Sequence, residues 1–175
     1  MSRSRTSESM ELQPATANDY EIILALNSNA IPDVNHLDRR ALKSLHEQAV
    51  ALIVARDVRT PGSGGSIGVF MLLLDEHADY ASANYQFFKR RYETFLYVDR
   101  IVVSPVHQRM GIGRRLYEEL FQLAGENPAT CEVNVVPPNP RSLAFHEQLG
   151  FSEVGEQDTE GGSKRVALLV RTRHP

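Results

Sequence analysis

The sequence predicts an α/β domain in which helices pack against a mixed sheet. Short apolar runs typical of buried strands alternate along the chain with segments whose apolar residues recur at helical spacing. The chain has 175 residues, of which 42% are hydrophobic, and this is enough for a buried core. The predicted elements follow the order βααβββαβαββ, with no internal repeat and no interdomain linker between Glu11 and Arg173.

The first half of the chain predicts three strands and two helices. Asn18 and Asp19 are suitable N-cap residues for the first helix, and Asp38 is suitable for the second. A continuous apolar run from Ala51 to Ala55 indicates a buried strand, and a glycine-rich turn at 61–65 makes the next strand its hairpin partner. The elements expected here are a strand at 11–14, a helix carrying residues 22–26, a helix from 38 to about 49, and strands at 51–55 and 67–74.

The second half contains a strand from Phe95 to Ser104 that is apolar on both faces apart from Asp99 and Arg100, as expected of a central strand. Residues 76–93 before it have no regular pattern and predict a loop with a short helix. The other expected elements are a helix from 111 to about 125 with Ile112, Leu116, Leu120 and Leu123 facing inward, a strand at 131–136, a helix at 139–149 that Gly150 ends, and strands at 151–154 and 165–170.

The composition argues against several classes of protein. The formal net charge is −3, so no overall basic field favours nucleic acid or a membrane surface as a partner. The single cysteine, Cys131, excludes an internal disulfide and fits a reducing, cytoplasmic location. No apolar run approaches the roughly 20 residues of a membrane-spanning helix. Residues 1–9 lack the apolar core of a secretory signal and are expected to form a disordered tail.

Two glycines, Gly111 and Gly113, lie between the central strand and the next helix. At such a junction the unpaired N–H groups of the first helical turn point at one place, which makes an anion site, and Arg109 and Arg114 add positive charge. Two common phosphate motifs do not fit. No Gly-x-x-x-x-Gly-Lys-Ser/Thr stretch is present, and Leu116 occupies the third glycine position of Gly-x-Gly-x-x-Gly.

The segment Gln108–Gly113 resembles the Gln/Arg-x-x-Gly-x-Gly/Ala motif of the GNAT superfamily of acyl-CoA N-acyltransferases. The segment Asn139–Phe151 is similar to a second motif of that family, an Asn-led helix that ends in Leu-Gly-Phe. The resemblance implies a mixed, mostly antiparallel sheet of six to seven strands with splayed fourth and fifth strands, and about four helices. It further implies a single N-acetyltransferase domain at residues 10–173 with acetyl-CoA as co-substrate, in a family where homodimers are common.

The resemblance also implies where coenzyme A binds. The pyrophosphate would lie on the glycine turn, the pantetheine arm would pair with the edge of the central strand, and the Asn-led helix would flank the coenzyme. A backbone N–H near Val103 would stabilise the oxyanion of the reaction. The implied coenzyme-binding residues are Ile101, Val102, Val103, Gln108, Arg109, Met110, Gly111, Ile112, Gly113, Arg114, Asn139, Ser142 and His146.

The implied reaction, attack of an amine on a thioester, needs a base. A free alkyl amine has a pKa of about 10.4 and is mostly protonated at neutral pH. Strand alternation places Asp99 on the same face as Ile101 and Val103, which makes it the base candidate. Many family members carry a glutamate at this position, so we expect a bridging water beside the shorter aspartate. The alternative is an ion pair between Asp99 and a neighbouring arginine.

His146 lies where many relatives carry the tyrosine that protonates the leaving thiolate. A histidine can donate a proton near neutral pH, so His146 is either that acid or only a coenzyme contact. Tyr97 and Tyr117 are the other candidate acids. Cys131 has no base beside it in the local sequence and is expected to be a buried, inert thiol.

The acceptor pocket is expected at the first two helices, their connection and the region around Tyr85. The polar candidates are Asn27, Asn29, Asp33 and Tyr85, each of which can also be a capping or turn residue. The six histidines show no metal-ligand spacing, so no metal site is expected. The expected function is acetyl transfer to a primary amine of a small molecule, amino acid or peptide. Transfer of a longer acyl group, acylation of a protein lysine and a non-catalytic acyl-CoA-binding module are the alternatives.

Overall fold

The computed structural model describes residues 10–58 and 65–172. The predicted disordered tail at 1–9 and most of the predicted turn at 61–65 lie outside the described residues. By its internal contacts the chain divides into two units. Unit 1 comprises residues 1–73 and 100–120, and unit 2 comprises residues 74–99 and 121–175.

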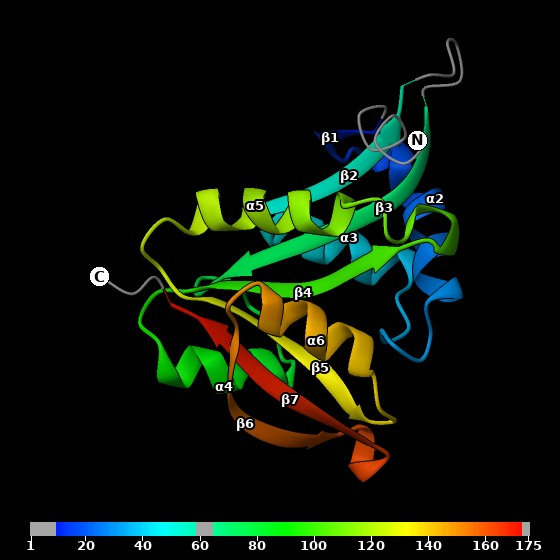
Figure 1. Cartoon of the computed structure of the whole chain (residues 1–175). Coiled ribbons are helices and arrows are strands. Elements are labelled where there is room, and N and C mark those ends of the chain that lie inside the picture. The colour runs from blue at the N-terminus through cyan, green and yellow to red at the C-terminus, as the bar shows by residue number, and fades with distance from the viewer. Residues whose placement is uncertain (1–9, 59–64, 173–175) are drawn as a thin grey trace. The chain divides into compact units, whose positions relative to one another are not determined.

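Seven strands form one mixed sheet in the order β1-β2-β3-β4-β5-β7-β6, as labelled in Figure 1. β4 and β5 pair in parallel at Leu96–Ala129 and Tyr97–Thr130. The pairs β1–β2, β2–β3, β5–β7 and β6–β7 are antiparallel, which confirms the predicted mixed sheet. The strands are β1 Met10–Pro14, β2 Ala51–Asp57, β3 Ser66–Asp75, β4 Leu96–Val103, β5 Ala129–Val136, β6 Ser152–Thr159 and β7 Lys164–Arg171.

Five α-helices and three short 3-10 helices connect the described strands. Asp19 and Asp38 are the N-caps of the first two α-helices, as predicted, and the Asp38 carboxylate accepts a hydrogen bond from the Ala41 N–H. No helix of the described residues is long and apolar enough to cross a membrane. The helices are η1 Ala17–Asp19, α2 Tyr20–Asn29, α3 Arg39–Gln48, α4 Ala83–Arg91, η2 Pro105–His107, α5 Ile112–Ala124, α6 Pro140–Gln148 and η3 Glu160–Gly162.

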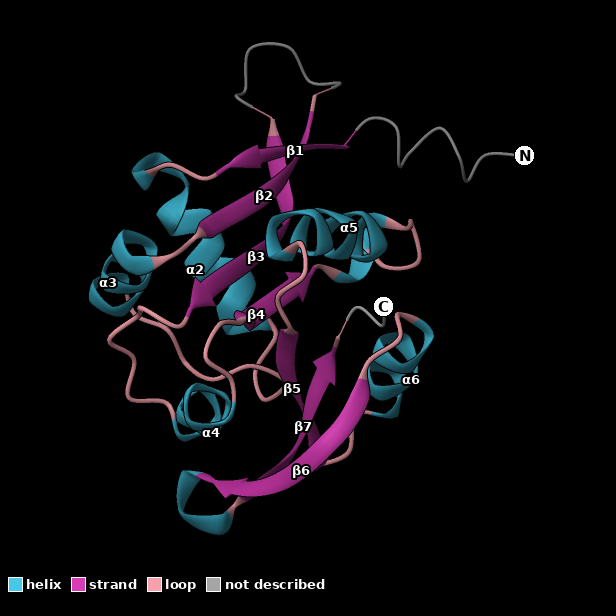
Figure 2. Cartoon of the chain, turned by 90° about the vertical axis from the view of Figure 1, so that its left-hand side faces the viewer, coloured by secondary structure: helices cyan, strands magenta, loops and turns pink. Residues whose placement is uncertain are grey.

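Within unit 1, α2 and α3 cover one face of β1, β2 and β3, and α5 covers the other (Figure 2). The apolar face of each helix is buried, with Ile23, Leu42 and Leu116 all inaccessible to solvent. A partly buried ion pair joins the start of α2 to β2, because Arg56 donates to the Asp19 carboxylate at 2.7 Å. Burial raises the pKa of Asp19, but hydrogen bonds from Arg56 and the Thr16 N–H outweigh that effect and lower it.

Within unit 2, α4 and α6 lie on opposite sides of β5, β7 and β6 (Figure 2). A cluster of aromatic rings joins α4 to the start of β4. Tyr85 is 5.6 Å from Phe95 and 5.5 Å from Tyr97 between ring centroids, and Phe88 is 5.9 Å from Tyr97. This cluster places the irregular segment predicted at 76–93 firmly against the sheet, with its short helix at α4.

Two details differ from the sequence-based expectations. Leu123 was expected to face inward with Ile112, but it is 48% exposed, because Ala124, four residues after the buried Leu120, takes the inward position in the last turn of α5. β6 continues to Thr159 instead of ending at Val154. Its antiparallel pairing with β7 extends to Thr159–Lys164, and an Arg165–Asp158 ion pair joins the outer ends of the two strands.

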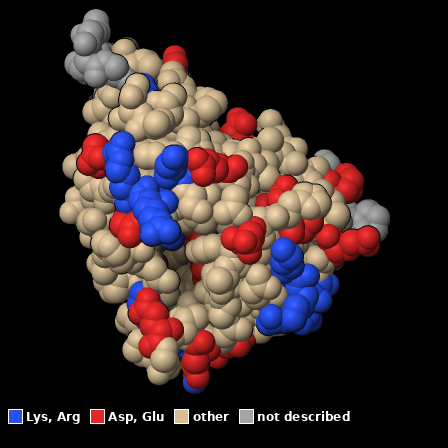
Figure 3. Space-filling model, turned by 180° about the vertical axis from the view of Figure 1, so that it is seen from behind, with Lys and Arg blue, Asp and Glu red and all other residues tan. Residues whose placement is uncertain are grey.

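The charged side chains are mixed on the surface. On the face seen in Figure 3, groups of Lys and Arg side chains stand beside Asp and Glu side chains. The described residues therefore present no continuous basic surface on this face, in keeping with the formal net charge of −3.

Candidate functional site

The connection from β4 to α5 contains two left-handed residues. After β4 ends at Val103, the chain forms η2 and then turns through Arg109, with a φ of 62°, and Gly111, with a φ of 78°. A glycine adopts this conformation readily, whereas Arg109 is strained in it by about 1 kcal/mol or more. Strain of this kind at a non-glycine residue is typical of functional turns.

The start of α5 presents backbone donors to the same turn. The Arg115 N–H donates to the Gly111 carbonyl at 3.2 Å, so the N–H groups of Ile112, Gly113 and Arg114 precede the first donor into the helix. The Ile112 side chain is buried, so this residue offers the turn only its backbone. Arg114 is exposed, and so is Arg109. Together with the positive end of the helix dipole, these groups make an anion site.

Arg115 belongs to the framework instead of the anion site. Its guanidinium donates to the Met10 carbonyl at 2.8 Å and thereby ties α5 to β1. Gln108 and Met110 complete the turn. The Gln108 side chain is exposed, and its amide reaches back to the Val103 carbonyl at 3.4 Å.

The turn is held in place by contacts of Ser104 and His107 with Gly68, which were not predicted from the sequence. The Ser104 N–H donates to the Gly68 carbonyl of β3 at 2.9 Å, and the Ser104 hydroxyl lies 2.6 Å from Nδ1 of His107. The His107 ring lies directly on Gly68, because a Cβ at this position would be 2.2 Å from the imidazole. A glycine inside a predicted strand can indicate such a close approach, so Gly68 is the sequence feature from which this contact could have been predicted.

The residues of β4 alternate in exposure. Asp99, Ile101 and Val103 are half-buried, whereas Arg100 and Val102 are buried. This pattern agrees with the predicted common face for Asp99, Ile101 and Val103. Val102 is available to a ligand only through its backbone, since its side chain lies in the core.

In unit 2 the Asn-led helix is α6, and Asn139 is its N-cap. The Asn139 side-chain oxygen accepts a hydrogen bond from the Ser142 N–H at 3.1 Å. His146 lies one turn further on and is only 3% exposed, with Phe145 and Phe151 in edge contact with its ring. Its Nδ1 is 2.7 Å from the Ser142 carbonyl oxygen.

This geometry determines which ring nitrogen of His146 carries the hydrogen. A carbonyl oxygen can only accept, so Nδ1 carries the hydrogen and Nε2 is the acceptor nitrogen of the neutral ring. Burial lowers the pKa of His146, and the bond to Ser142 offsets this only in part. In a neutral imidazole with the hydrogen on Nδ1, Nε2 carries no proton. It can therefore accept a hydrogen bond from a ligand but cannot donate a proton to a leaving group.

Tyr97, another candidate acid, already donates its hydroxyl hydrogen to another side chain. The Tyr97 side chain is fully buried, and its hydroxyl donates to Oε1 of Glu132 at 2.9 Å. Burial, and then the charges of Glu132 and Asp99, raise the pKa of Tyr97 well above its usual value. Asn84 also donates to Oε1 of Glu132, at 3.1 Å. Glu132 was not identified from the sequence, because its importance depends on partners from other elements.

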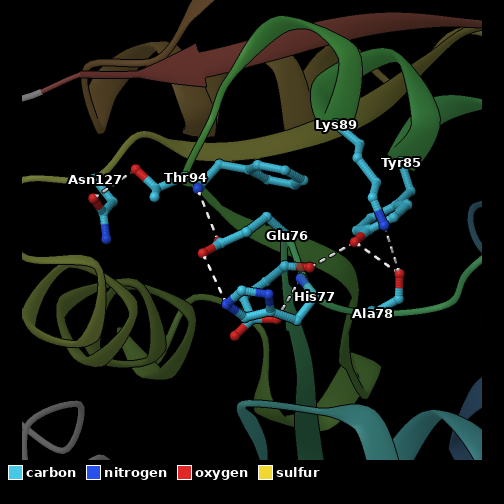
Figure 4. A network of polar contacts seen from close by, with 9 residues as sticks. Glu76, His77, Ala78, Tyr85, Lys89, Thr94 and Asn127 are labelled. Carbon is cyan, nitrogen blue, oxygen red and sulfur yellow. Dashed lines mark hydrogen bonds and ion pairs between the residues drawn. The ribbon is translucent and has the colours of Figure 1, made fainter.

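The four predicted acceptor residues have different environments. Tyr85 is fully buried, and its hydroxyl donates to the carbonyls of Asp75 at 2.7 Å and Ala78 at 3.1 Å (Figure 4). Burial and the nearby Asp75 charge raise the pKa of Tyr85 to about 12. Asn27 is likewise fully buried. Asn29 and Asp33 are exposed, at the end of α2 and in the connection to α3.

The predicted site residues fall into two groups. Unit 1 contains Asn27, Asn29 and Asp33 together with residues 101–103 and 108–114. Unit 2 contains the other predicted residues, which are Tyr85, Asp99, Asn139, Ser142 and His146.

Residues 37–151 match the acetyltransferase (GNAT) family. A curated Escherichia coli protein, ribosomal protein bS18-alanine N-acetyltransferase, is 41% identical over 54 residues, which are 30% of this chain and 36% of that protein. The matched region thus spans about a third of the length of this relative.

Solved structures share the fold. Arabidopsis thaliana NAA60 in complex with acetyl-CoA superposes with a TM-score of 0.74 and 14% sequence identity, covering 94% of this chain and 99% of that one. The ribosomal-protein-S18-alanine N-acetyltransferase from Escherichia coli has a TM-score of 0.65 and 16% identity, covering 93% of both chains. At these identities the likeness establishes the fold alone.

Proposed function

Because the chain belongs to the GNAT family of acetyltransferases, we propose that it transfers an acetyl group from acetyl-CoA to a primary amine. The observation that carries this proposal is the turn from Gln108 to Arg114. It combines two left-handed residues, the open N-terminus of α5 and two exposed arginines. Such a turn is suited to a pyrophosphate, which is the charged centre of coenzyme A.

The coenzyme would use backbone groups of unit 1 at two places. The N–H groups of residues 112–114, with Arg109 and Arg114, would bind the phosphates. The backbone of Ile101 to Val103 would pair with the amide groups of the pantetheine arm, in the manner of an added strand. The half-buried Ile101 and Val103 side chains offer apolar contact there. Bound in this way, acetyl-CoA supplies an activated thioester.

Asn139, Ser142 and His146 of α6 are proposed to contact the coenzyme through their polar atoms. Nδ1 of His146 is committed to the Ser142 carbonyl, so we assign this residue a hydrogen-bond contact and not the acid role. The leaving thiol has a pKa near 8.5 if it resembles cysteine, so it departs without strong acid assistance.

Asp99 is the proposed base. It shares a face of β4 with Ile101 and Val103, where the thioester would lie, and a carboxylate can accept the amine proton directly or through a water. Asp99→Asn keeps the shape and removes the basic oxygen charge. We expect the rate to fall by about 100-fold with little change in acetyl-CoA affinity. Thiol release measures the rate and calorimetry measures the affinity; a variant with the wild-type rate would remove Asp99 from this role.

For the acceptor, the curated relative suggests a protein or peptide amine. The test is release of free thiol from acetyl-CoA in the presence of short peptides with a free N-terminus, with the same peptides blocked at the N-terminus as controls. Polyamines and free amino acids test the small-molecule alternative. Acetyl-CoA binding with no thiol release for any amine would instead support the non-catalytic module.

A further inference from the structure

A cleft in unit 2 lies at the last turn of α5. It is bounded by the end of this helix, the connection to β5 and the point where β7 ends, which meet on the left-hand side of Figure 1. Its volume is about 360 Å³, within the range of small-molecule sites. The lining residues all belong to unit 2, and none of them is a predicted site residue. They include Phe121, Ala124, Asn127, Ala129 and Arg171.

Arg171 supplies the positive charge of the cleft. It is the last residue of β7 and pairs with Ala129 at the start of β5. Its Cζ lies 3.7 Å from the centroid of the Phe121 ring, so the planar guanidinium lies over this ring. Phe121 in turn contacts Phe151, with 6.1 Å between the ring centroids. This packing fixes the position of the guanidinium before any ligand binds.

The nitrogen donors of this guanidinium remain available to a ligand. Among residues 10–58 and 65–172, the Arg171 guanidinium has a ring contact but no hydrogen-bond or ion-pair partner. The side chain is half-buried. A guanidinium in this setting is suited to a carboxylate, because its planar fork can donate two parallel N–H···O bonds to the two carboxylate oxygens.

Asn127 adds a second donor at the rim of the cleft. Its side-chain oxygen accepts a hydrogen bond from the Thr94 hydroxyl at 3.0 Å, and its amide nitrogen points away from Thr94 (Figure 4). Nδ2 can therefore donate to a ligand. The apolar part of the lining comes from the Phe121 ring and from the buried Ala124 and Ala129. The cleft thus combines donors for an anion with an apolar wall.

We propose that this cleft is a second ligand site, which binds a small organic carboxylate with an apolar body. The carboxylate accepts hydrogen bonds from Arg171 and Asn127, and the apolar body covers Ala124 and Ala129. Offsetting the negative end of the α5 dipole requires only a cation, whereas the stacked ring and the cleft beside it suit recognition of a ligand. The inference does not depend on the proposed acetyl transfer.

The test uses phenylacetate as the probe. Phenylacetamide is its neutral analogue, and acetate is the carboxylate without the apolar body. Calorimetry measures the affinities, and the amide chemical shifts of the full chain locate the probe. We expect phenylacetate to bind with a dissociation constant of about 1 mM or less. Both analogues should bind about tenfold more weakly, and the shift changes should centre on residues 121–129 and on Arg171.

Two test variants identify the binding groups. Arg171→Gln removes the cation, and Asn127→Asp keeps the acceptor for Thr94 while it places a negative charge at the rim. Each should weaken phenylacetate binding by about tenfold or more. Asn127→Asp alters an exposed side chain, so it decides the question if Arg171→Gln does not fold. Arg165→Gln is the matched control and should keep the wild-type affinity, because Arg165 is an exposed arginine of the same strand outside the cleft.

Absence of saturable phenylacetate binding would overturn the inference, and so would equal affinity for phenylacetamide. Shift changes centred on residues 111–114 would place the carboxylate at the proposed coenzyme turn, with the same consequence. Wild-type affinity in Arg171→Gln, or in Asn127→Asp if the former does not fold, would show that the cleft is not the site. Acetyl transfer is measured separately by thiol release, and its absence would leave each of these outcomes unchanged.

Discussion

Gly111 has a left-handed backbone in open surroundings. Its φ is 78°, and a Cβ built on it would meet no atom within 4 Å. A substitution at this position is therefore opposed by the backbone conformation and not by a clash. A β-branched residue in this conformation costs on the order of 1–2 kcal/mol, which the turn can relieve only by changing shape.

We expect Gly111→Val to weaken acetyl-CoA binding by about tenfold or more, equivalent to about 1.4 kcal/mol, as measured by calorimetry. Gly161→Val is the matched control. Gly161 has a φ of 66° with no atom within 4 Å of an added Cβ, and it lies in η3, outside the proposed site. Both variants should lose similar stability, and only Gly111→Val should lose affinity. Equal affinity in the two variants would contradict the role of the turn.

His146 makes the stability of the protein depend on pH. Burial lowers its pKa below the ordinary value of 6.5, so the folded state stays neutral where the unfolded state takes up a proton. The free energy of unfolding should therefore fall as pH drops below about 6.5, until the folded protein also protonates. Denaturant unfolding at pH 7.5 and 5.5 measures this fall. It should be smaller in His146→Gln, while His36→Gln, at an exposed position, should retain the wild-type dependence.

At the scale of single elements, β3 and the β4–α5 connection fit together through Gly68 and His107. In Gly68→Ala the new Cβ would be 2.2 Å from the His107 imidazole, so this ring must move. The turn that follows His107 would be displaced with the ring. We expect weaker acetyl-CoA binding, which His107→Ala should partly restore in the double variant by making room. Gly155→Ala is the control, since its Cβ would meet Phe87 at 3.4 Å, an ordinary contact. No loss of affinity in Gly68→Ala would disprove this coupling.

The β3–α4 connection depends on Tyr85. Tyr85→Phe removes the donor to the Asp75 and Ala78 carbonyls, which should lower the free energy of unfolding by about 1–3 kcal/mol. Tyr92→Phe makes the same chemical change on a half-buried ring and should change stability by less than about 0.5 kcal/mol. If Tyr85 were an acceptor contact, its variant would instead raise acceptor KM with little loss of stability, and steady-state kinetics distinguish the two.

Across the whole molecule, local signals were readable from the sequence and long-range partners were not. The glycine turn and the caps at Asp19 and Asp38 are local, because a few neighbouring residues determine them. The contact of Arg115 with Met10 and that of Arg100 with Asn27 join residues 105 and 73 positions apart. Nothing in the neighbourhood of either arginine indicates its partner.

The candidate site shows the same division. The coenzyme turn was predicted because its signal lies in six consecutive residues, Gln108–Gly113. The burial of Tyr85 and Asn27, both expected at the acceptor, depends on packing between elements. Helical spacing also placed Leu123 in the core, but the buried residue of the last turn of α5 is its neighbour Ala124.

Arg109 implies a conflict between stability and function. The left-handed backbone conformation costs arginine more free energy than it would cost glycine. Replacement of Arg109 by glycine should therefore raise the free energy of unfolding. The same replacement would remove a cation from the proposed phosphate turn. Selection for heat-resistant variants of this protein would therefore favour glycine at this position. Such variants would bind the proposed acyl donor less tightly than the wild-type protein does.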